Sequence, residues 1–488
     1  MVYLPKFAAL KSKYNNKYLR YVNEKSSPVR TFLQYSGDEI LTPFTKFEFE
    51  KAQSDPSSYH IKCCYNNKYL VSASSSDHHY IVAGADQKQE DKSKWTCTLF
   101  RPTYDNYHQS FRFSHVYLGS HVVLWRFHAP YGECLRAQSS YHTKDHPCDL
   151  NMVINMESLI ALPKFLAFTG DNGLYLREIK RGSNNVPYLQ FGSSSVDDST
   201  IRMESFITKD GSTRFKSSHS GKFWRCDHTS NYFVILDYST YDNDNNTQRS
   251  TDTLFSPTQI SPNVVALRNL GNGNFVKRYS SGNDQNFLFA ERNEIDAFAH
   301  LRMTELVRSR EIFDVAFHLS DAKIHNQSVV ALATKSATNG TGKPTNVKLN
   351  IPYTNTSYCT WTSIISTKQV EVKTVIKSEV PLIVDGKIFS TASDYFGEYK
   401  WGETISESEN TNGITHEATV PPMSNIIGTL YATKGSFDIP FSYKQSDILF
   451  AGNNNNPVEF SLDDGVYHGT NYYNFQYDIK IVPISTSI

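Results

Sequence analysis

Short apolar stretches recur along the first 300 residues or so of the chain. Each is followed by a turn rich in Asn or Gly and then by a stretch that contains an aromatic residue. This order of strand, turn and strand predicts β-hairpins. Copies occupy residues 10–20, 61–70, 170–177, 215–225 and 267–277, and a weaker copy lies around Phe113–Trp125.

The spacing of the copies predicts how they are arranged. Tyr18 and Tyr69 are 51 positions apart, and Phe223 and Phe275 are 52 apart. A longer period of 157 positions separates Tyr18 from Tyr175, so the hairpins come in threes and the triplet is duplicated. Three such units around a pseudo-threefold axis form a β-trefoil. The alternative is a kelch-type propeller, but none of the 24 glycines is followed by the second glycine that its signature contains.

The chain changes character after about Arg310. The repeats stop, Ser, Thr, Val and Ile become more frequent, and stretches such as 346–351 and 426–441 alternate between apolar and polar residues. Alternation of this kind predicts an extended, mostly antiparallel β domain without clear helices. Between the two triplets, Val153–Pro163 predicts a short helical turn that ends at a proline.

The predicted fold class is therefore all-β. Two tandem β-trefoil domains are followed by an elongated antiparallel β domain. The expected boundaries are 1–152 for the first trefoil, 153–164 for the linker, 165–305 for the second trefoil and 306–488 for the third domain.

Residues 370–390 form an amphipathic segment within the third domain. Most odd-numbered positions of its first part carry charge, whereas the even-numbered positions are uncharged: Val370, Val372, Thr374, Ile376, Ser378 and Val380. An apolar turn is expected at 381–386, with Leu382, Ile383 and Val384, before a returning strand at 387–395 that includes Ile388.

Two interpretations of this segment stay open on the pattern alone. A strand of about eleven residues is long enough to cross the hydrocarbon core of a bilayer, so the segment is a candidate membrane-insertion hairpin. The other interpretation is a half-buried hairpin on the surface of a soluble sandwich.

Composition narrows the classes of function. Lys and Arg together number 49, as do Asp and Glu, so the formal net charge is zero. A nucleic-acid partner is not expected, because phosphate binding needs a clustered surplus of basic residues. The longest apolar runs contain about five residues, whereas a membrane-spanning helix needs about 20.

The start of the sequence and its cysteines suggest a compartment. Met1–Lys6 shows neither a basic start nor a long apolar stretch, so no signal peptide is expected. Seven cysteines is an odd number without framework spacing, which indicates reduced thiols. We expect a cytoplasmic or nucleocytoplasmic protein that associates with membranes only after assembly.

Catalytic and metal-binding motifs are not found. His416–Val420 lacks the second histidine of a His-Glu-x-x-His motif, and no Gly-x-Ser-x-Gly or Gly-x-Gly-x-x-Gly motif occurs. His115, His121 and His128 are scattered, without the company of other ligands. We therefore predict no enzymatic activity, no metal and no cofactor.

Residues 1 to about 305 resemble the amaranthin-type plant lectins, in which a short helix joins two β-trefoils. The resemblance is carried by Lys17–Tyr21, Leu33–Ser36, Asn67–Val71, Ser93–Phe100 and Leu189–Gly192. It implies binding of glycans that contain galactose or N-acetylgalactosamine, such as the T-antigen disaccharide. It also implies a homo-oligomer, since in amaranthin the cleft lies between the first trefoil of one chain and the second trefoil of its dimer mate.

The sugar site of this family uses a loop of the first trefoil with the run Asn-His-Tyr-Trp. This chain has Asp77, His78, His79 and Tyr80 there, so the final aromatic is kept as Tyr and the residue before it differs. An aromatic face and neighbouring polar groups are what sugar recognition needs. The resemblance implies that these four residues bind carbohydrate; the alternative is an ordinary hydrophilic turn.

From about residue 310 the chain looks like the aerolysin-type pore-forming module. The resemblance is carried by Val380–Gly386, Tyr399–Thr404 and Ala418–Pro422. It implies protomers that assemble on a receptor-bearing membrane and insert one hairpin each, which places the insertion hairpin at 369–390. The resulting hypothesis is a plant defence lectin with a pore-forming module. The alternative is a non-lytic lectin or stress-signalling protein whose third domain mediates oligomerisation only.

Overall fold

The computed structural model describes residues 3–24, 26–74, 79–127, 129–138, 147–181, 186–228, 232–237, 250–365, 372–390, 395–399, 401–450 and 456–484. The protein is all-β, as predicted. Over these residues its regular structure consists of β-strands and four short 3₁₀ helices, and none of them is α-helical.

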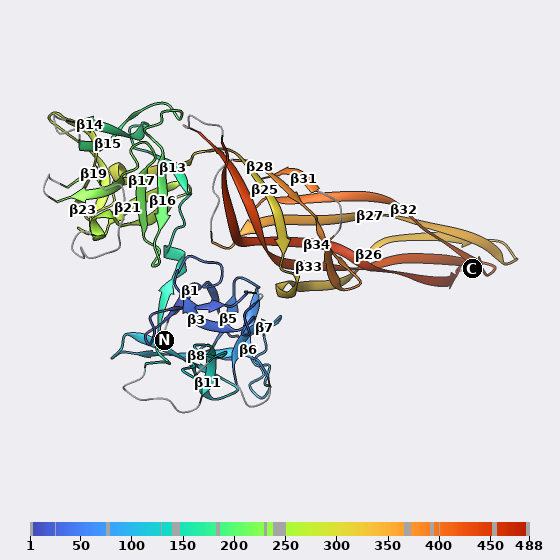
Figure 1. The fold of residues 1–488 in the computed structure, drawn as a ribbon. Helices are drawn as coiled ribbons and strands as arrows, with labels where there is room; N and C mark the ends of the chain where they lie inside the picture. Colours follow the sequence, from blue (N-terminus) through green and yellow to red (C-terminus); the bar gives the residue numbers. More distant parts are fainter. Residues whose placement is uncertain are drawn as a thin grey trace. The chain divides into compact units, whose positions relative to one another are not determined.

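Twelve strands form the first sheet (Figure 1). They are β1 (Phe7–Ser12), β2 (Tyr18–Tyr21), β3 (Leu33–Gly37), β4 (Phe47–Lys51), β5 (Tyr59–Cys63), β6 (Lys68–Ser72), β7 (Ile81–Ala85), β8 (Leu99–Asp105), β9 (Ser110–His115), β10 (Ser120–Leu124), β11 (Leu135–Gln138) and β12 (Asn151–Asn155). Strands β1, β4, β5, β8, β9 and β12 pair in that order, and β12 returns to β1, so the six close into a barrel. The hairpins β2–β3, β6–β7 and β10–β11 complete the sheet.

The second sheet repeats this plan. Its strands are β13 (Phe165–Thr169), β14 (Tyr175–Arg181), β15 (Val186–Ser193), β16 (Met203–Ile207), β17 (Thr213–Ser217), β18 (Phe223–Asp227), β19 (Phe233–Asp237), β20 (Phe255–Ser261), β21 (Val264–Asn269), β22 (Phe275–Ser281), β23 (Asp284–Arg292) and β24 (Leu301–Glu305). Strands β13, β16, β17, β20, β21 and β24 close the barrel. Three hairpins, β14–β15, β18–β19 and β22–β23, pair with one another across its end.

The predicted hairpin copies are the places where a barrel strand meets a capping hairpin. The marker aromatics share one register position, because Tyr18 faces Lys11, Tyr69 faces Lys62 and Phe223 faces Lys216. The weaker copy keeps this register with a histidine, since His121 faces Ser114. Because an imidazole replaces the aromatic side chain at this position, the copy around Phe113–Trp125 is hard to recognise in the sequence.

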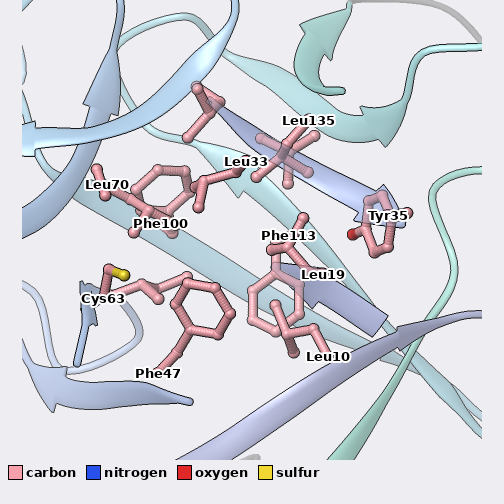
Figure 2. Packing of buried hydrophobic residues seen from close by; sticks show 14 of the residues in the cluster. Leu10, Leu19, Leu33, Tyr35, Phe47, Cys63, Leu70, Phe100, Phe113 and Leu135 are labelled. Carbon is pink, nitrogen blue, oxygen red and sulfur yellow. The ribbon is translucent and has the colours of Figure 1, made fainter. Parts of the chain in front are cut away.

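Each barrel has its own apolar core. Figure 2 shows the first core, in which side chains from all three repeats meet: Leu10, Leu19, Leu33, Tyr35, Phe47, Cys63, Leu70, Phe100, Phe113 and Leu135. Trp224 is fully buried in the second core, with its ring 4.7 Å from Phe215 and 5.7 Å from Phe168. Burial of such large rings supplies most of the driving force for closing each barrel.

The segment between the two barrels begins with the 3₁₀ helix η1 (Met156–Ser158). The side chain of Asn155 accepts a hydrogen bond from the Glu157 amide at 2.9 Å and so caps it. Three further 3₁₀ helices are η2 (Ser250–Thr253), η3 (Ala297–Ala299) and η4 (Leu319–Asp321).

Longer strands build the third sheet (Figure 1). They are β25 (Val307–Phe317), β26 (Lys323–Asn339), β27 (Thr345–Ser363), β28 (Lys373–Ser378), β31 (Tyr395–Tyr399), β32 (Thr404–Val420), β33 (Ser424–Leu449) and β34 (Val458–Pro483). The order is β31-β28-β25-β33-β34-β27-β32, and β26 also pairs with β33. A separate two-stranded sheet holds β29 (Pro381–Val384) and β30 (Lys387–Ser390).

The chain divides into two compact units. The first comprises residues 1–311, 363–374 and 444–464, and the second comprises 312–362, 375–443 and 465–488. In the second unit, Trp361 is buried against Phe441 and Tyr467, with ring centroids 5.1 and 4.9 Å away. The ring of Phe441 lies against Gly465, where a Cβ atom would collide with it, so this packing requires a glycine.

Candidate functional site

The predicted sugar-binding residues fall in two groups. Asp77 and His78 lie outside the described residues. His79 and Tyr80 precede β7, and Tyr80 is only 8% exposed. The ring of Tyr80 is packed into the cap of the first barrel, which is not the exposure of an ordinary hydrophilic turn.

The cap is a triangle of aromatic rings. Phe32, Tyr80 and Tyr131 have centroids 5.1–5.6 Å apart. The second barrel has a corresponding triangle of Tyr188, Phe233 and Phe287, with centroids 5.7–5.9 Å apart.

Strand register aligns Tyr80 with Phe233 of the second barrel. Phe32 bridges to Val82 in the first barrel, and Tyr188 pairs with Ile235 in the second, so Val82 corresponds to Ile235. Two positions earlier in each strand, Tyr80 therefore corresponds to Phe233. A ring at this position closes the end of a barrel in both cases. Tyr80 therefore packs the cap and presents little surface to a ligand.

Polar side chains gather beside this cap. The carbonyl of His79 accepts a hydrogen bond from the Ala137 amide at 2.8 Å, which draws β11 alongside the predicted sugar loop. This pairing positions Arg136, which lies on β11. Its guanidinium is 3.8 Å from the ring centroid of Trp125 and 5.6 Å from that of Tyr80. Cation–π contacts of this length hold an arginine in place.

Three buried polar atoms of this cluster have no hydrogen-bond partner among the described residues. They are Nδ1 of His79, Nε of Arg136 and Oε1 of Gln138. Most buried polar atoms in folded proteins are paired. Arg136 and Gln138 lie two positions apart on β11, and His79 pairs with this strand through its backbone. Two apolar rings stand beside them partly open to solvent, Phe127 at 50% and Tyr131 at 38% exposure. We call His79, Trp125, Phe127, Arg136 and Gln138 the cap cluster.

A buried histidine lies near the cap cluster. Burial lowers the pKa of His115 to about 4, although its hydrogen bond to the Cys97 carbonyl at 3.0 Å opposes the shift. The charge of the nearby His79 adds to the lowering. His115 is thus a neutral structural residue at ordinary pH.

The predicted insertion segment is packed against the protein through its uncharged face. Val370 lies outside the described residues, and Val372, Thr374 and Ile376 are 5%, 2% and 0% exposed. Strand β28, which holds the last two, lies between β25 and β31 in the third sheet. The alternation predicted from the sequence therefore matches the buried and exposed sides of this strand.

The expected apolar turn at 381–386 is wrong. Pro381–Val384 forms β29, Ile383 faces Ile388 of β30, and the turn is confined to Asp385 and Gly386. Their φ angles of 48° and 74° are those of a two-residue hairpin turn, which an Asp-Gly pair favours. The other predicted residues of this segment are less buried. Val380, Leu382 and Ile388 are half-buried, and Val384 is 45% exposed.

One side chain fastens this short hairpin to the third sheet. Asn471 of β34 accepts a hydrogen bond from the Ile383 amide at 3.0 Å and donates one to the Ile383 carbonyl at 2.9 Å. Both residues are buried, at 6% and 1% exposure. A Cβ atom at Gly435 would lie 3.0 Å from Cδ1 of Ile383, so a glycine leaves the space that Ile383 occupies.

Among the described residues, no three or more His, Cys, Asp or Glu side chains are arranged to hold a metal ion. No helix in the described ranges is long and apolar enough to span a bilayer.

Comparison with protein families identifies the two barrels. The family model of the Agglutinin domain matches residues 2–153 and again residues 160–305. The chain belongs to the agglutinin-domain family.

Solved structures similar to this agglutinin-family chain include toxins. A mosquitocidal holotoxin is 10% identical, with 65% of this chain and 36% of the holotoxin covered and a TM-score of 0.30. A lamprey immune protein is 12% identical, with 67% and 94% covered and a TM-score of 0.29. An aerolysin-like protein of Bombina maxima is 14% identical, with 36% and 99% covered and a TM-score of 0.25.

Similarities at this level do not assign a function to the chain, which spans little more than a third of the holotoxin's length. The search of curated protein sequences found no match.

Four residues of the cap cluster in this agglutinin-family protein are not predicted from the sequence. They are Trp125, Phe127, Arg136 and Gln138, which come from the third repeat, more than forty positions after the predicted loop. A signal was present nevertheless. Strand register makes Arg136 equivalent to Phe289 of the second barrel, because Tyr80 bridges to Arg136 and Phe233 pairs with Phe289. Arg136 is thus a charged residue at a position where the second barrel has an apolar one.

Proposed function

We propose that the protein is a lectin that binds glycans containing galactose or N-acetylgalactosamine and carries a pore-forming module. In this proposal the two barrels are β-trefoil lectin domains, and residues 306–488 are an aerolysin-like module. The observation that carries the lectin part is the Agglutinin-domain match over both barrels. Two closed six-stranded barrels, each completed by three hairpins, support the trefoil assignment.

The cap cluster supports carbohydrate binding in the first barrel. A pyranose ring presents an apolar face, which packs on aromatic side chains, and hydroxyl groups, which need donors and acceptors. Phe127 supplies a half-exposed ring, and His79, Arg136 and Gln138 supply polar atoms that have no partner within the described residues. Asp77, His78 and Tyr80 remain part of the proposed site by resemblance, with Tyr80 acting through the packing of the cap.

The pore-forming part rests on the amphipathic segment. Residues 372–378 bury an uncharged face in the third sheet, and β29–β30 forms a small sheet of its own. In our proposal the protomers bind glycans on a membrane, form a homo-oligomer, and each inserts residues 370–390. Several weak glycan sites on one oligomer act together and raise its effective affinity for the membrane. A plant defence role follows from this combination as part of the proposal.

Glycan binding by the full chain tests the proposal directly. Titration calorimetry with galactose, N-acetylgalactosamine and the T-antigen disaccharide should show binding, and mannose serves as the control sugar. Gln138→Ala should weaken binding about tenfold, since one hydrogen bond to a ligand is lost. Gln476→Ala, an exposed glutamine of β34, should change nothing. No detectable binding of any galactose-type sugar would contradict the lectin assignment.

A further inference from the structure

Arg136 is a half-buried cation for which the described residues provide no counter-ion. Its guanidinium lies on Trp125 and near Tyr80, and no carboxylate of the described residues lies within ion-pair distance of it. The nearest acidic residue along the chain, Glu133, accepts a hydrogen bond from Asn15 at 3.0 Å. Charged groups removed from water are ordinarily paired with an opposite charge, and an external anion would supply that charge to Arg136.

The second barrel provides the contrast. Arg181 lies over the equivalent aromatic triangle, 5.0 Å from the centroid of Phe287 and 5.7 Å from that of Tyr188. There, however, the guanidinium forms an ion pair with Asp284. Both barrels therefore place an arginine on their aromatic cap, but only the second has a described carboxylate that neutralises it.

The groups around Arg136 match a saccharide that carries a negative charge. A guanidinium offers several N–H groups in one plane, which pair with the two oxygens of a carboxylate or a sulfate. Gln138 Oε1 and His79 Nδ1 have no hydrogen-bond partner among the described residues, and each is a polar group that a sugar hydroxyl can pair with. Phe127, 50% exposed and 4.7 Å from Trp125, extends the aromatic surface next to the charge.

We propose that the cap cluster selects acidic glycans: a galactose-type glycan whose carboxylate or sulfate group pairs with Arg136. The inference rests on the proposed lectin function and specifies the chemical class of its ligand. Arg136 is then the specificity-determining residue, Gln138 and His79 bind hydroxyl groups, and the aromatic rings contact the sugar face.

The test compares matched glycans on the full chain. The probes are the T-antigen disaccharide, its sialylated form and its sulfated form, with affinities measured by titration calorimetry at low and high salt. The acidic forms should bind at least about tenfold more tightly than the neutral one, because an ion-paired hydrogen bond is stronger than a neutral one. The difference should shrink as salt is raised, since salt screens a partly exposed charge.

Variants assign the effect to one side chain. Arg136→Gln should abolish the preference, so that the variant binds the acidic forms no more tightly than it binds the neutral disaccharide, because the group that pairs with the anion is gone. Arg181→Gln is the matched control and should leave the preference intact. If Arg136→Gln does not fold, Arg136→Lys keeps the charge without the planar fork and should retain only part of the preference.

The outcomes separate this inference from the proposed function. Equal affinity for neutral and acidic forms overturns the inference and leaves the lectin assignment standing. A preference that survives in Arg136→Gln also overturns it, because the anion is then held elsewhere. Absence of binding to every probe refutes the lectin proposal itself. Preference for only the carboxylate or only the sulfate supports the inference and identifies the charged group.

Discussion

Burial distinguishes Tyr80 from Arg136 in the cap of the first barrel. Tyr80 and Arg136 are paired by a β-bridge, yet the tyrosine ring is enclosed and Nε of the arginine has no hydrogen-bond partner among the described residues. The resemblance to the lectin family implies that Tyr80 binds sugar, but how deeply its ring lies cannot be read from the sequence. That depth depends on Phe32 and Tyr131, which are about fifty positions away on either side.

Tyr80→Ala should therefore destabilise the first barrel. Loss of a buried ring from a close-packed cap should lower the free energy of unfolding by about 3 kcal/mol, measured by chemical denaturation. Tyr80→Phe keeps the ring, as Phe233 does in the second barrel, and should cost far less. A stability unchanged by Tyr80→Ala would mean that the ring is not part of the cap.

His115 should make the stability of the first barrel depend on pH. Its pKa of about 4 in the folded protein is below the value of about 6.5 expected when unfolded, so the unfolded chain binds protons more readily. The stability is fully present above pH 6.5 and is lost as the pH falls toward 4. Between pH 7 and pH 5 the loss should be about 2 kcal/mol.

Denaturation of the original protein and of His115→Gln at both pH values checks this expectation. The variant should lose the part of the pH dependence that comes from this imidazole. Identical pH dependence in the two proteins would show that His115 titrates normally.

At the scale of elements, the spacing of residues in the sequence predicts which segments are strands better than it predicts which strands pair. The hairpin copies, including the weak one at His121, and the amphipathic face of β28 all follow from local spacing that the chain carries within ten residues. The turn expected over 381–386 is shorter in the structure, because the apolar residues Pro381–Val384 form β29. The Asp385-Gly386 pair is the stronger turn signal, and Pro381 fits at the first position of β29.

Asn471 should control how firmly the β29–β30 hairpin is held. Asn471→Leu keeps the volume but leaves the amide and carbonyl of Ile383 without their partner, at a cost of about 2 kcal/mol or roughly a 30-fold shift toward the detached hairpin. Limited trypsin digestion should then cut faster after the exposed Lys387.

Asn346→Leu is the matched control on β27, where the asparagine is exposed and its side chain accepts only from Thr419 at 2.8 Å. It should not change the rate of cleavage. If Asn471→Leu and Asn346→Leu are cleaved equally fast, Asn471 does not fasten the hairpin.

For the whole molecule, the all-β class followed from the repeats, whereas the third sheet could not be assembled from the sequence. Strand β33 pairs with both β25 and β26, and Lys323 meets Asp438 across more than a hundred positions. No local pattern encodes such long-range pairing. The domain boundaries derived from the repeats remain a prediction, and the compact units divide the chain differently, since residues 444–464 group with the barrels.

Dye release from liposomes tests the central claim that a lectin directs a pore-forming module to membranes. Vesicles are prepared with and without a glycolipid that ends in galactose or N-acetylgalactosamine, and the full chain is added to both. Our account predicts release only from vesicles that contain the glycolipid. Binding to those vesicles without release, at any pH or after proteolysis, would contradict it and leave a non-lytic lectin whose third domain has another role.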